Sequence, residues 1–428
     1  MYEWSETDLM VRDAVRAFIA KEIRPNLDAL ESGEMPPYPV IRKLFAEFGV
    51  DTMARETVEK MLAGERARVD GTARAEGGGK GDDDEAGARG GEAAEGRDSM
   101  ITVVISELAG VCMGLVSALG VSLGLGATTI MSRGTLEQKE RWLPGIMTME
   151  KVASWAITEP DSGSDAFGGM KTYVRRSGDG YVLNGRKTFI TNGPYADVMI
   201  VYAKLDEGDP AVSPRDRTVL TFVLEKGMPG LTQGAPFAKM GLHSSPTGEL
   251  FFDDVRLGRE HLLGGTEGRD GGEGRDAGRE SARSSFTAER IGVATMALGI
   301  ISECHRLCVD YARERTLWGQ EIGRFQLIQL KLAKMEVARM NVQNMVFHSL
   351  ERARAGKPLT LAEASAMKLY SSEAATEVAM DAVQLFGGNG YMAEYRVEQL
   401  ARDAKSLMIY AGSNEIQVTH IAKGLLGR

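Results

Sequence analysis

The amino-acid sequence changes its hydrophobic pattern twice, and this change limits the fold more than any other feature. Apolar residues recur at helical spacing in residues 5–48, 101–149 and 286–426. Between residues 153 and 263, short runs rich in β-branched and aromatic residues alternate with turn signals. Asn184-Gly185 lies between two such runs and predicts a hairpin. The sequence therefore predicts an α+β protein in which an antiparallel β domain separates two helical domains.

Two polar segments interrupt this order. The first, about residues 66–97, is of low complexity and has almost nothing to bury, so we expect a disordered or mobile insertion. The second, residues 264–284, is rich in Gly, Arg and Glu and predicts a polar linker. The expected domains are therefore helical at residues 1–150, β at 151–263 and helical at 285–428.

Composition excludes several classes of protein. The 428 residues carry a formal net charge of -9 and no basic block, so we expect no nucleic-acid partner. The three cysteines do not make a disulfide framework, and the acidic start carries no signal peptide, which together favour the cytoplasm. Cys304, His305 and Cys308 have helical spacing, but a zinc site would need a fourth ligand, so we expect no metal.

One stretch raises the question of a membrane. Residues 108–131 contain no charged side chain and are long enough to span a bilayer. The stretch also contains five glycines, and no basic cluster flanks it. Small residues at this spacing let helices approach closely, so we favour two buried core helices broken near Gly120 over a membrane span.

Motifs in series give the sequence its strongest functional signal. They span residues 156–165, 184–193, 384–391, 402–405 and 409–417. Together they resemble the acyl-CoA dehydrogenase family, and the likeness covers nearly the whole chain apart from the two polar segments. The resemblance implies a C-terminal four-helix bundle, FAD as cofactor, an acyl-CoA thioester as substrate and an electron-transfer flavoprotein as electron acceptor.

The residues themselves agree with a flavin site. Hydroxyls and backbone N–H groups gathered at strand ends beside glycines can hold the carbonyls and ring nitrogens of an isoalloxazine. By the resemblance, the positions expected against FAD are Trp155, Ile157, Thr158, Ser164, Phe189, Thr191, Arg315, Trp318, Gln326, Gln384, Gly387, Gly388, Ser413 and Glu415.

Part of this set implies an oligomer. In the family, the positions of Arg315, Trp318, Gln384, Gly387 and Gly388 reach the FAD of a neighbouring subunit. An arginine fork suits a pyrophosphate, and glycines allow close backbone approach. The resemblance therefore implies a homo-oligomer, a tetramer by analogy.

The catalytic base is the point at which the sequence departs from the family. The family dehydrogenates the α,β bond: a carboxylate takes the α-proton while flavin N5 takes the β-hydride. Most members carry that glutamate at the position of Ala411, where only the backbone N–H remains to serve the thioester oxygen. Some members place the base before an arginine at the start of the first long C-terminal helix, and Glu289-Arg290 match that pair. The positions expected at the substrate are Ser164, Arg290, Tyr410 and Gly412.

Other interpretations remain open at this stage. A Glu-Arg pair also suits the N-terminal end of a helix without any catalytic role. Glu415 is a weaker candidate base, because Asn414 and Gln417 have the spacing of a helix capping box beside it. The absent glutamate also allows a flavin monooxygenase, another non-dehydrogenating member of the fold, or a non-catalytic acyl-CoA-binding protein.

Overall fold

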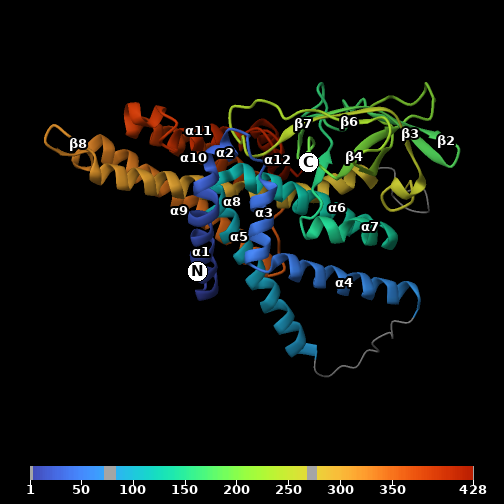
Figure 1. Cartoon of the computed structure of the whole chain (residues 1–428), viewed down its shortest axis with the longest axis horizontal. Coiled ribbons are helices and arrows are strands. Elements are labelled where there is room, and N and C mark those ends of the chain that lie inside the picture. Colours follow the sequence, from blue (N-terminus) through green and yellow to red (C-terminus); the bar gives the residue numbers. More distant parts are fainter. Residues whose placement is uncertain (1–2, 72–82, 268–276, 428) are drawn as a thin grey trace.

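The computed structural model describes residues 3–71, 83–267 and 277–427, and it has the predicted order of helices, sheet and helices (Figure 1). The N-terminal helices pack around α5, which continues into a π-helical turn, η3. Their bounds are α1 Glu6–Phe18, η1 Ile19–Ile23, η2 Arg24–Asn26, α2 Leu27–Glu31, α3 Tyr38–Glu47, α4 Val50–Val69, α5 Asp83–Gly120, η3 Val121–Ala127, α6 Thr128–Arg133 and α7 Leu136–Met147.

The middle domain is one curled sheet of seven strands. The strand order is β1-β4-β2-β3-β7-β6, and the seventh strand, β5, pairs with β4 outside this order. Most pairings are antiparallel as predicted, but β4 runs parallel to both β1 and β2, so the sheet is mixed. The strands are β1 Ala153–Ala156, β2 Tyr173–Ser177, β3 Gly180–Thr191, β4 Val198–Leu205, β5 Val219–Glu225, β6 Leu231–Gln233 and β7 Thr247–Leu257, followed by the short helix η4 Arg259–His261.

The predicted hairpin turn at Asn184-Gly185 is wrong. The β2–β3 hairpin turns earlier, because Ser177 pairs with Gly180. Asn184 and Gly185 lie inside β3, where the register against β7 shifts. Gly185 has φ +136°, and a Cβ there would lie 2.7 Å from the Cα of Thr172, so only glycine fits. The dipeptide marks a β-bulge instead of a turn.

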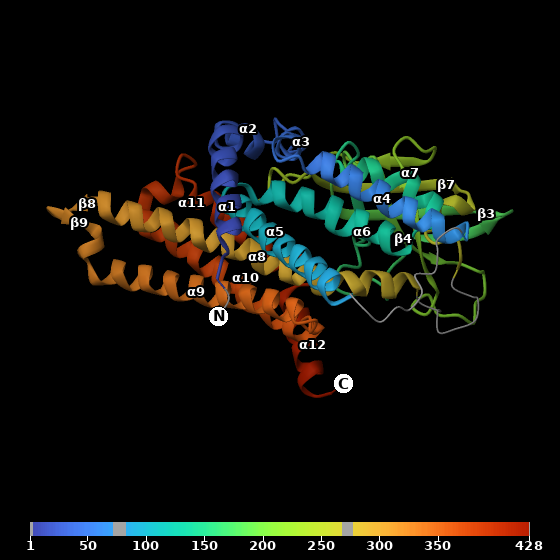
Figure 2. The same cartoon turned by 90° about the horizontal axis from the view of Figure 1, so that it is seen from below.

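The C-terminal domain is the helical bundle that the sequence predicts. Its first helix, α8, packs against both α5 and α10, and at its N-terminal end it also contacts β5. It therefore runs from the β domain into the bundle (Figure 2). The elements are α8 Ala277–Glu314, β8 Thr316–Leu317, β9 Gln320–Glu321, η5 Ile322–Arg324, α9 Gln326–Arg354, α10 Leu361–Phe386, η6 Gly387–Tyr391, α11 Val397–Ser406 and α12 Asn414–Leu425.

The two polar segments are partly helical. Residues 66–69 close α4, and from Asp83 onward the backbone belongs to α5. The linker likewise ends early, because α8 already begins at Ala277. Alanine, glutamate and arginine are good helix formers, which accounts for helix in segments with little to bury. Residues 72–82 of the expected disordered insertion and residues 268–276 of the expected linker lie outside the described residues.

Two helical stretches, 98–133 and 285–314, are long and apolar enough to cross a membrane, by length and composition alone. In each, 61% of the most apolar window is buried inside the protein, as core helices are. Their contact explains the small residues: a Cβ on Gly110 would lie 2.9 Å from the carbonyl oxygen of Gly299. The break expected near Gly120 is a kink at Cys112 followed by the π-helical η3.

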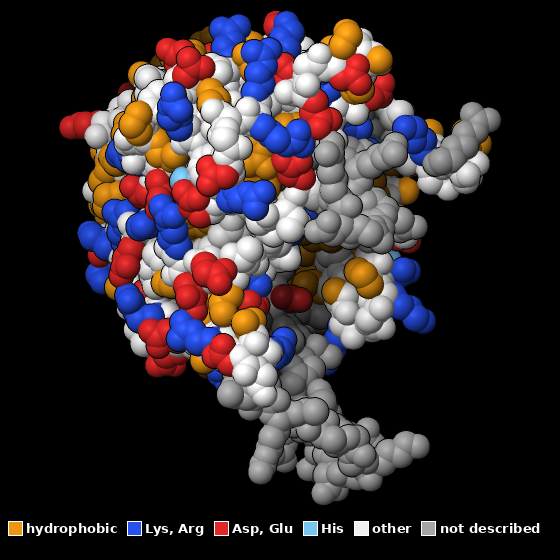
Figure 3. Space-filling view, turned by 90° about the vertical axis from the view of Figure 1, so that its right-hand side faces the viewer, with side chains coloured by type: hydrophobic (Ala, Val, Ile, Leu, Met, Phe, Trp, Pro, Cys, Tyr) orange, Lys and Arg blue, Asp and Glu red, His pale blue; other side chains and the backbone are white. Residues whose placement is uncertain are grey.

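The outer end of the β domain carries a mixed charge. Blue and red side chains interleave on this face (Figure 3). Arg175 pairs with Asp206, and Arg176 pairs with Glu207, both at the surface. Exposed pairs of this kind contribute little to stability, so the core of the domain holds it together.

Asn192 joins the β domain to α5. Its Nδ2 donates to the carbonyl oxygens of Ala118 (2.8 Å) and Ala153 (2.9 Å), and its Oδ1 accepts from the hydroxyl of Tyr38 (2.9 Å). The side chain is fully buried. Asn192 also has φ +65°, which asparagine tolerates better than most residues.

We predict that Asn192→Ala lowers the free energy of unfolding by about 2–4 kcal/mol, because it leaves buried polar groups without partners. Urea unfolding followed by circular dichroism measures the change. Asn341→Ala is the matched control, since Asn341 makes one exposed hydrogen bond, to Tyr370. Equal midpoints for the two variants would show that Asn192 does not hold the domains together.

Candidate active site

Glu289 lies in the interior of α8, well past its first residue. The helix-end explanation for this acidic residue is therefore wrong, because the helix begins a dozen residues earlier. Its side chain is half-buried. Burial raises the pKa of Glu289 to about 7, although the neighbouring cations of Arg290 and Lys368 favour the carboxylate. A carboxyl group with this pKa can accept or return a proton near neutral pH.

Arg290 is buried with part of its charge unsatisfied. The residue is 2% exposed, and its Nε and Nη1 have no hydrogen-bond partner among the described residues. Its guanidinium lies 5.7 Å from the ring centroid of Phe286. Burial lowers the pKa of Arg290. A buried guanidinium with free N–H groups costs free energy unless a ligand supplies acceptors, so this side chain fits a polar or anionic part of a substrate.

The loop between α11 and α12 turns through two left-handed residues. Ala411 has φ +56° and Gly412 has φ +82°. Alanine in this conformation costs roughly 1–2 kcal/mol, so the surroundings must hold it there. Gln417 does so: its Nε2 donates to the carbonyl oxygens of Ala411 (3.1 Å) and Gly412 (2.7 Å).

The N–H of Ala411 has no acceptor among the described residues. The adjacent Tyr410 is half-buried and lies beside Ser117 of α5, and burial raises the pKa of its phenol. A fixed, unpaired N–H beside a carboxyl group of near-neutral pKa is the arrangement that a developing oxyanion needs.

Sequence reasoning missed Lys368, which no motif marks. It lies on α10 and is completely buried, and its Nζ donates to the carbonyl oxygen of Gly412 (2.8 Å) and to Oδ1 of Asn414 (2.9 Å). Burial lowers the pKa of Lys368 to about 8. A lysine flanked by Ala366-Met367 and Leu369-Tyr370 is the signal that could have found it, because both neighbours on each side are small or apolar.

The residues expected around the flavin ring gather at the β1 and β3 end of the sheet. The N–H of Thr188 donates to the carbonyl oxygen of Thr158 (3.0 Å), which brings the segment after β1 against β3. Phe189 has φ +57° at the register shift in β3, and its ring is 67% exposed. Thr191 ends the same strand, and Trp155 in β1 donates through Nε1 to the hydroxyl of Tyr202 (3.2 Å).

This patch fits an aromatic cofactor. Phe189 is exposed and left-handed, and among the described residues its ring has one aromatic neighbour, Phe237, with the two ring centroids 5.9 Å apart. The half-buried threonines Thr158 and Thr191 supply hydroxyls around it. Ile157 differs from the rest because its side chain is buried, while Ser164 lies exposed in the connection to β2.

Sequence reasoning also missed an ion pair beside this patch, between Lys187 and Glu159. Lys187, fully buried, donates through Nζ to the carbonyl oxygen of Ile157 (3.0 Å) and to Glu159 (2.8 Å). Glu159 in turn accepts from the backbone N–H groups of Lys171 and Thr172. The pair fixes the segment that carries Thr158.

Another group of predicted residues lies away from Glu289. The β8–β9 hairpin, which carries Arg315 and Trp318, is at the opposite end of the molecule from the sheet (Figure 1). Trp318 is 87% exposed. The rest of this group is exposed too: Arg315, Gln326, Gln384, Gly387 and Gly388. The structure does not bring these residues to the site of Glu289 within one chain.

The predicted capping box beside Glu415 is wrong. Ser413 is the residue before α12, and no side chain caps the helix. Oδ1 of Asn414 instead accepts from Lys368 and Ser372, and Gln417 holds the Ala411 loop. Glu415 itself is exposed at the helix start, where its own N–H and Ser413 lower the pKa of its carboxyl group. An exposed carboxylate of low pKa is poorly suited to act as the base.

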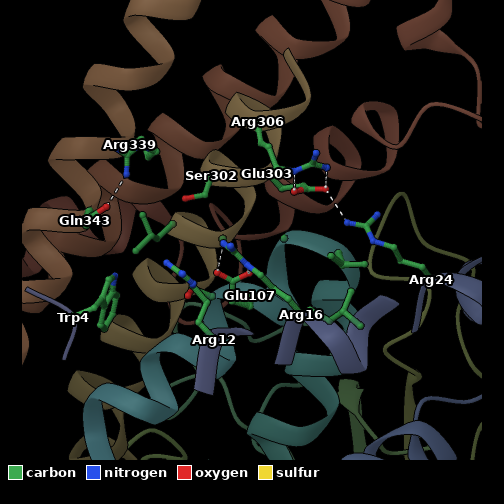
Figure 4. Close-up of a pocket in the computed structure, with 16 residues that line it drawn as sticks. Trp4, Arg12, Arg16, Arg24, Glu107, Ser302, Glu303, Arg306, Arg339 and Gln343 are labelled. Carbon is green, nitrogen blue, oxygen red and sulfur yellow. Dashed lines mark hydrogen bonds and ion pairs between the residues drawn. The ribbon is translucent and has the colours of Figure 1, made fainter. Parts of the chain in front are cut away.

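A cavity of about 630 Å³ lies elsewhere, between α1, α5, α8 and α9 (Figure 4). Part of its charged lining is paired internally. Arg16 makes two hydrogen bonds to Glu107, and Glu303 accepts from Arg24 and Arg306. The Arg24–Glu303 pair connects the N-terminal helices to α8 of the bundle.

Family models match three parts of the chain. Residues 87–150, 154–255 and 276–426 match the N-terminal, middle and C-terminal domains of acyl-CoA dehydrogenases. The chain belongs to the acyl-CoA dehydrogenase family, and it is an oxidoreductase with the fold of that family.

Some relatives and solved structures match this chain along almost their whole length. An acyl-CoA dehydrogenase of Bacillus subtilis is 33% identical, over 99% of each chain. The caffeyl-CoA reductase–Etf complex subunit CarC of Acetobacterium woodii is 31% identical, again over 99% of each. The solved butyryl-CoA dehydrogenase of Megasphaera elsdenii superposes with a TM-score of 0.80 at 31% identity, covering 100% of both chains. The fold also occurs in an FAD complex of PigA (24% identity, TM-score 0.78, 99% of both).

We predict that Glu289→Gln stabilises the folded protein at alkaline pH. The raised pKa means that the folded state disfavours the carboxylate, so wild type loses stability as pH rises from about 4.5 through about 7. Glutamine carries no charge and avoids this loss. The free energy of unfolding of the variant should therefore exceed that of wild type by about 1–3 kcal/mol above pH 7 and should equal it below pH 4.5. Thermal melts from pH 4 to 9 measure the difference.

Glu415→Gln is the control for this measurement. The lowered pKa of Glu415 has the opposite sign, so its neutralisation should not stabilise the protein at high pH. Melting curves of Glu289→Gln that parallel wild type at every pH would contradict a desolvated carboxyl group.

Proposed function

We propose that this chain is an FAD-dependent acyl-CoA dehydrogenase with Glu289 as its catalytic base. The observation that carries the proposal is the carboxyl group of pKa about 7 beside a buried, partly unpaired guanidinium. The N–H of Ala411, which has no acceptor among the described residues, and the exposed ring of Phe189 support it.

Asn192 and Ser117 connect the two parts of this site. Asn192 follows Thr191 in the chain and bonds Ala118 of α5, while Tyr410 lies beside Ser117. Asn192, the neighbour of Thr191, therefore bonds α5 one residue away from Ser117, which lies beside Tyr410 of the Ala411 loop. Bound FAD supplies the acceptor for the substrate's β-hydride.

The protein's own groups handle the proton and the oxyanion. Glu289 accepts the α-proton of the thioester, and the N–H of Ala411 donates to the thioester oxygen as negative charge develops there. Arg290 supplies donors to a polar part of the substrate. Because the methyl group of Ala411 is smaller than a glutamate side chain, the site has room beside the α-carbon for a branched or ring-bearing acyl group.

We predict that Glu289→Gln lowers the rate of anaerobic flavin bleaching by acyl-CoA about 10²–10⁴-fold while FAD stays bound. In wild type, the rate should rise with pH and level off above about 7, since the base acts only when ionised. A stopped-flow screen over short, long, branched and cyclic acyl-CoAs measures both effects.

Glu59→Gln, at an exposed position of α4, is the control and should keep the wild-type rate. Full activity in Glu289→Gln would refute the assignment of the base. A bound flavin that no acyl-CoA bleaches, with oxygen consumption on addition of reduced flavin, would instead favour a monooxygenase. Purification without FAD would favour a non-catalytic acyl-CoA-binding protein.

The proposal includes a homo-oligomer and an electron-transfer flavoprotein as acceptor. Leu327, Leu330, Val337 and Met340 are exposed and lie along one side of α9. An apolar helix side of this extent needs a covering partner. Together with exposed Trp318, it supports assembly with other copies of the chain. Membership of the relative CarC in an Etf complex supports the choice of electron acceptor.

We predict that Leu330→Glu with Val337→Glu reduces the assembly state and weakens FAD retention, because charges oppose burial of this side of α9. Light scattering and flavin absorbance after gel filtration measure both. Met53→Glu changes an exposed apolar residue on α4 and serves as the control. An unchanged mass for the double variant would place the subunit interface elsewhere.

A further inference from the structure

We propose that Lys368 is a positioning residue for the dehydrogenation: it holds the loop of Ala411 in its left-handed turn and places a cation near Glu289. The inference rests on the proposed function, in which Glu289 is the base. It goes beyond that function by assigning a role to a residue on α10, a helix that carries neither Glu289 nor Ala411.

The ammonium group of Lys368 connects three elements. It donates to the carbonyl oxygen of Gly412 in the loop and to Oδ1 of Asn414, the first residue of α12. Ser372, one turn further along α10, donates to the same Oδ1 of Asn414 (3.1 Å). The start of α12 is therefore tied to α10 by two neighbouring turns, and the loop before it cannot shift freely.

The carbonyl groups of Ala411 and Gly412 are both restrained. Gln417 donates to both, and Lys368 adds a charge-assisted hydrogen bond to the second. Left-handed turns at a non-glycine residue persist only where the surroundings fix them. Removing the Lys368 bond leaves Gln417 as the side chain, among the described residues, that still bonds the carbonyl groups of this turn.

The same ammonium group acts on Glu289 by its charge. Glu289 faces two cations, Arg290 on its own helix and Lys368 on α10, and Tyr410 from the loop. Lys368 faces Arg290 and Glu289 from α8, Glu415 from α12 and Glu373 from its own helix. Because all these groups lie at one junction, loss of the Lys368 cation removes one of the two charges that stabilise the Glu289 carboxylate.

The test compares Lys368→Met with Lys204→Met. Lys204 is also buried and donates to one carbonyl oxygen, that of Gly168, but it lies on β4 away from Glu289. Lys368→Met should lower kcat about 10²-fold at pH 7 and move the rising limb of the pH profile up by about one unit. Lys204→Met should leave the limb in place.

Lys368→Arg separates charge from geometry. It keeps the cation but cannot place a compact ammonium group between the two oxygens. The rising limb of the pH profile should therefore stay at its wild-type pH, while kcat falls about tenfold. This variant also carries the test should Lys368→Met not fold, because an unchanged kcat in Lys368→Arg would overturn the positioning role.

Two results would overturn the proposal. If Lys368→Met loses activity but the rising limb of its pH profile does not shift, Lys368 has only a structural role. If Lys368→Met has wild-type kinetics, Lys368 has no role in the reaction. Failure of the proposed function is seen separately: Glu289→Gln would then stay active. An inactive Glu289→Gln together with an unmoved Lys368→Met limb refutes only the inference about Lys368.

Discussion

The close contact of α5 and α8 is the constraint on which the rest of the site depends. Gly110 and Gly299 face each other where any side chain would collide with backbone. This contact sets the position of α8 along its length, and α8 carries Glu289 from the β domain toward the bundle. The same helix, α5, accepts a hydrogen bond from Asn192 of the β domain and lies beside Tyr410 of the Ala411 loop. Both the flavin patch and the Ala411 loop are therefore positioned against α5.

The site is built from buried charges that compensate one another incompletely. Glu289, Arg290 and Lys368 each have a pKa displaced by burial, in the direction that disfavours their charged forms. Among the described residues, Nε and Nη1 of Arg290 have no hydrogen-bond acceptor. Such an arrangement destabilises the protein without substrate, and binding of a substrate that supplies acceptors offsets this free-energy cost. The left-handed backbone at Ala411 and Phe189 also costs stability, and ligand binding at these positions would offset that cost.

The order of domains and the family could be predicted from the sequence, because hydrophobic period and serial motifs are both local in the chain. The Asn184-Gly185 turn could not, since its bulge depends on Thr172 from another strand. The roles of Lys368 and Lys187 were also invisible, because their partners are backbone carbonyls whose position only the fold defines. The family motif predicted Glu289 as the base, but it could not predict the position of Glu289 inside α8, because that helix begins within a glycine-rich segment.

The left-handed turn at Ala411 separates a chemical role from the identity of a side chain. An amide N–H belongs to every residue except proline, so the donor survives most substitutions at this position. What the position must supply is a backbone that accepts positive φ, which β-branched residues resist. In the proposed function, the side chain at this position is then free to change with the substrate, while the backbone N–H still donates to the thioester oxygen.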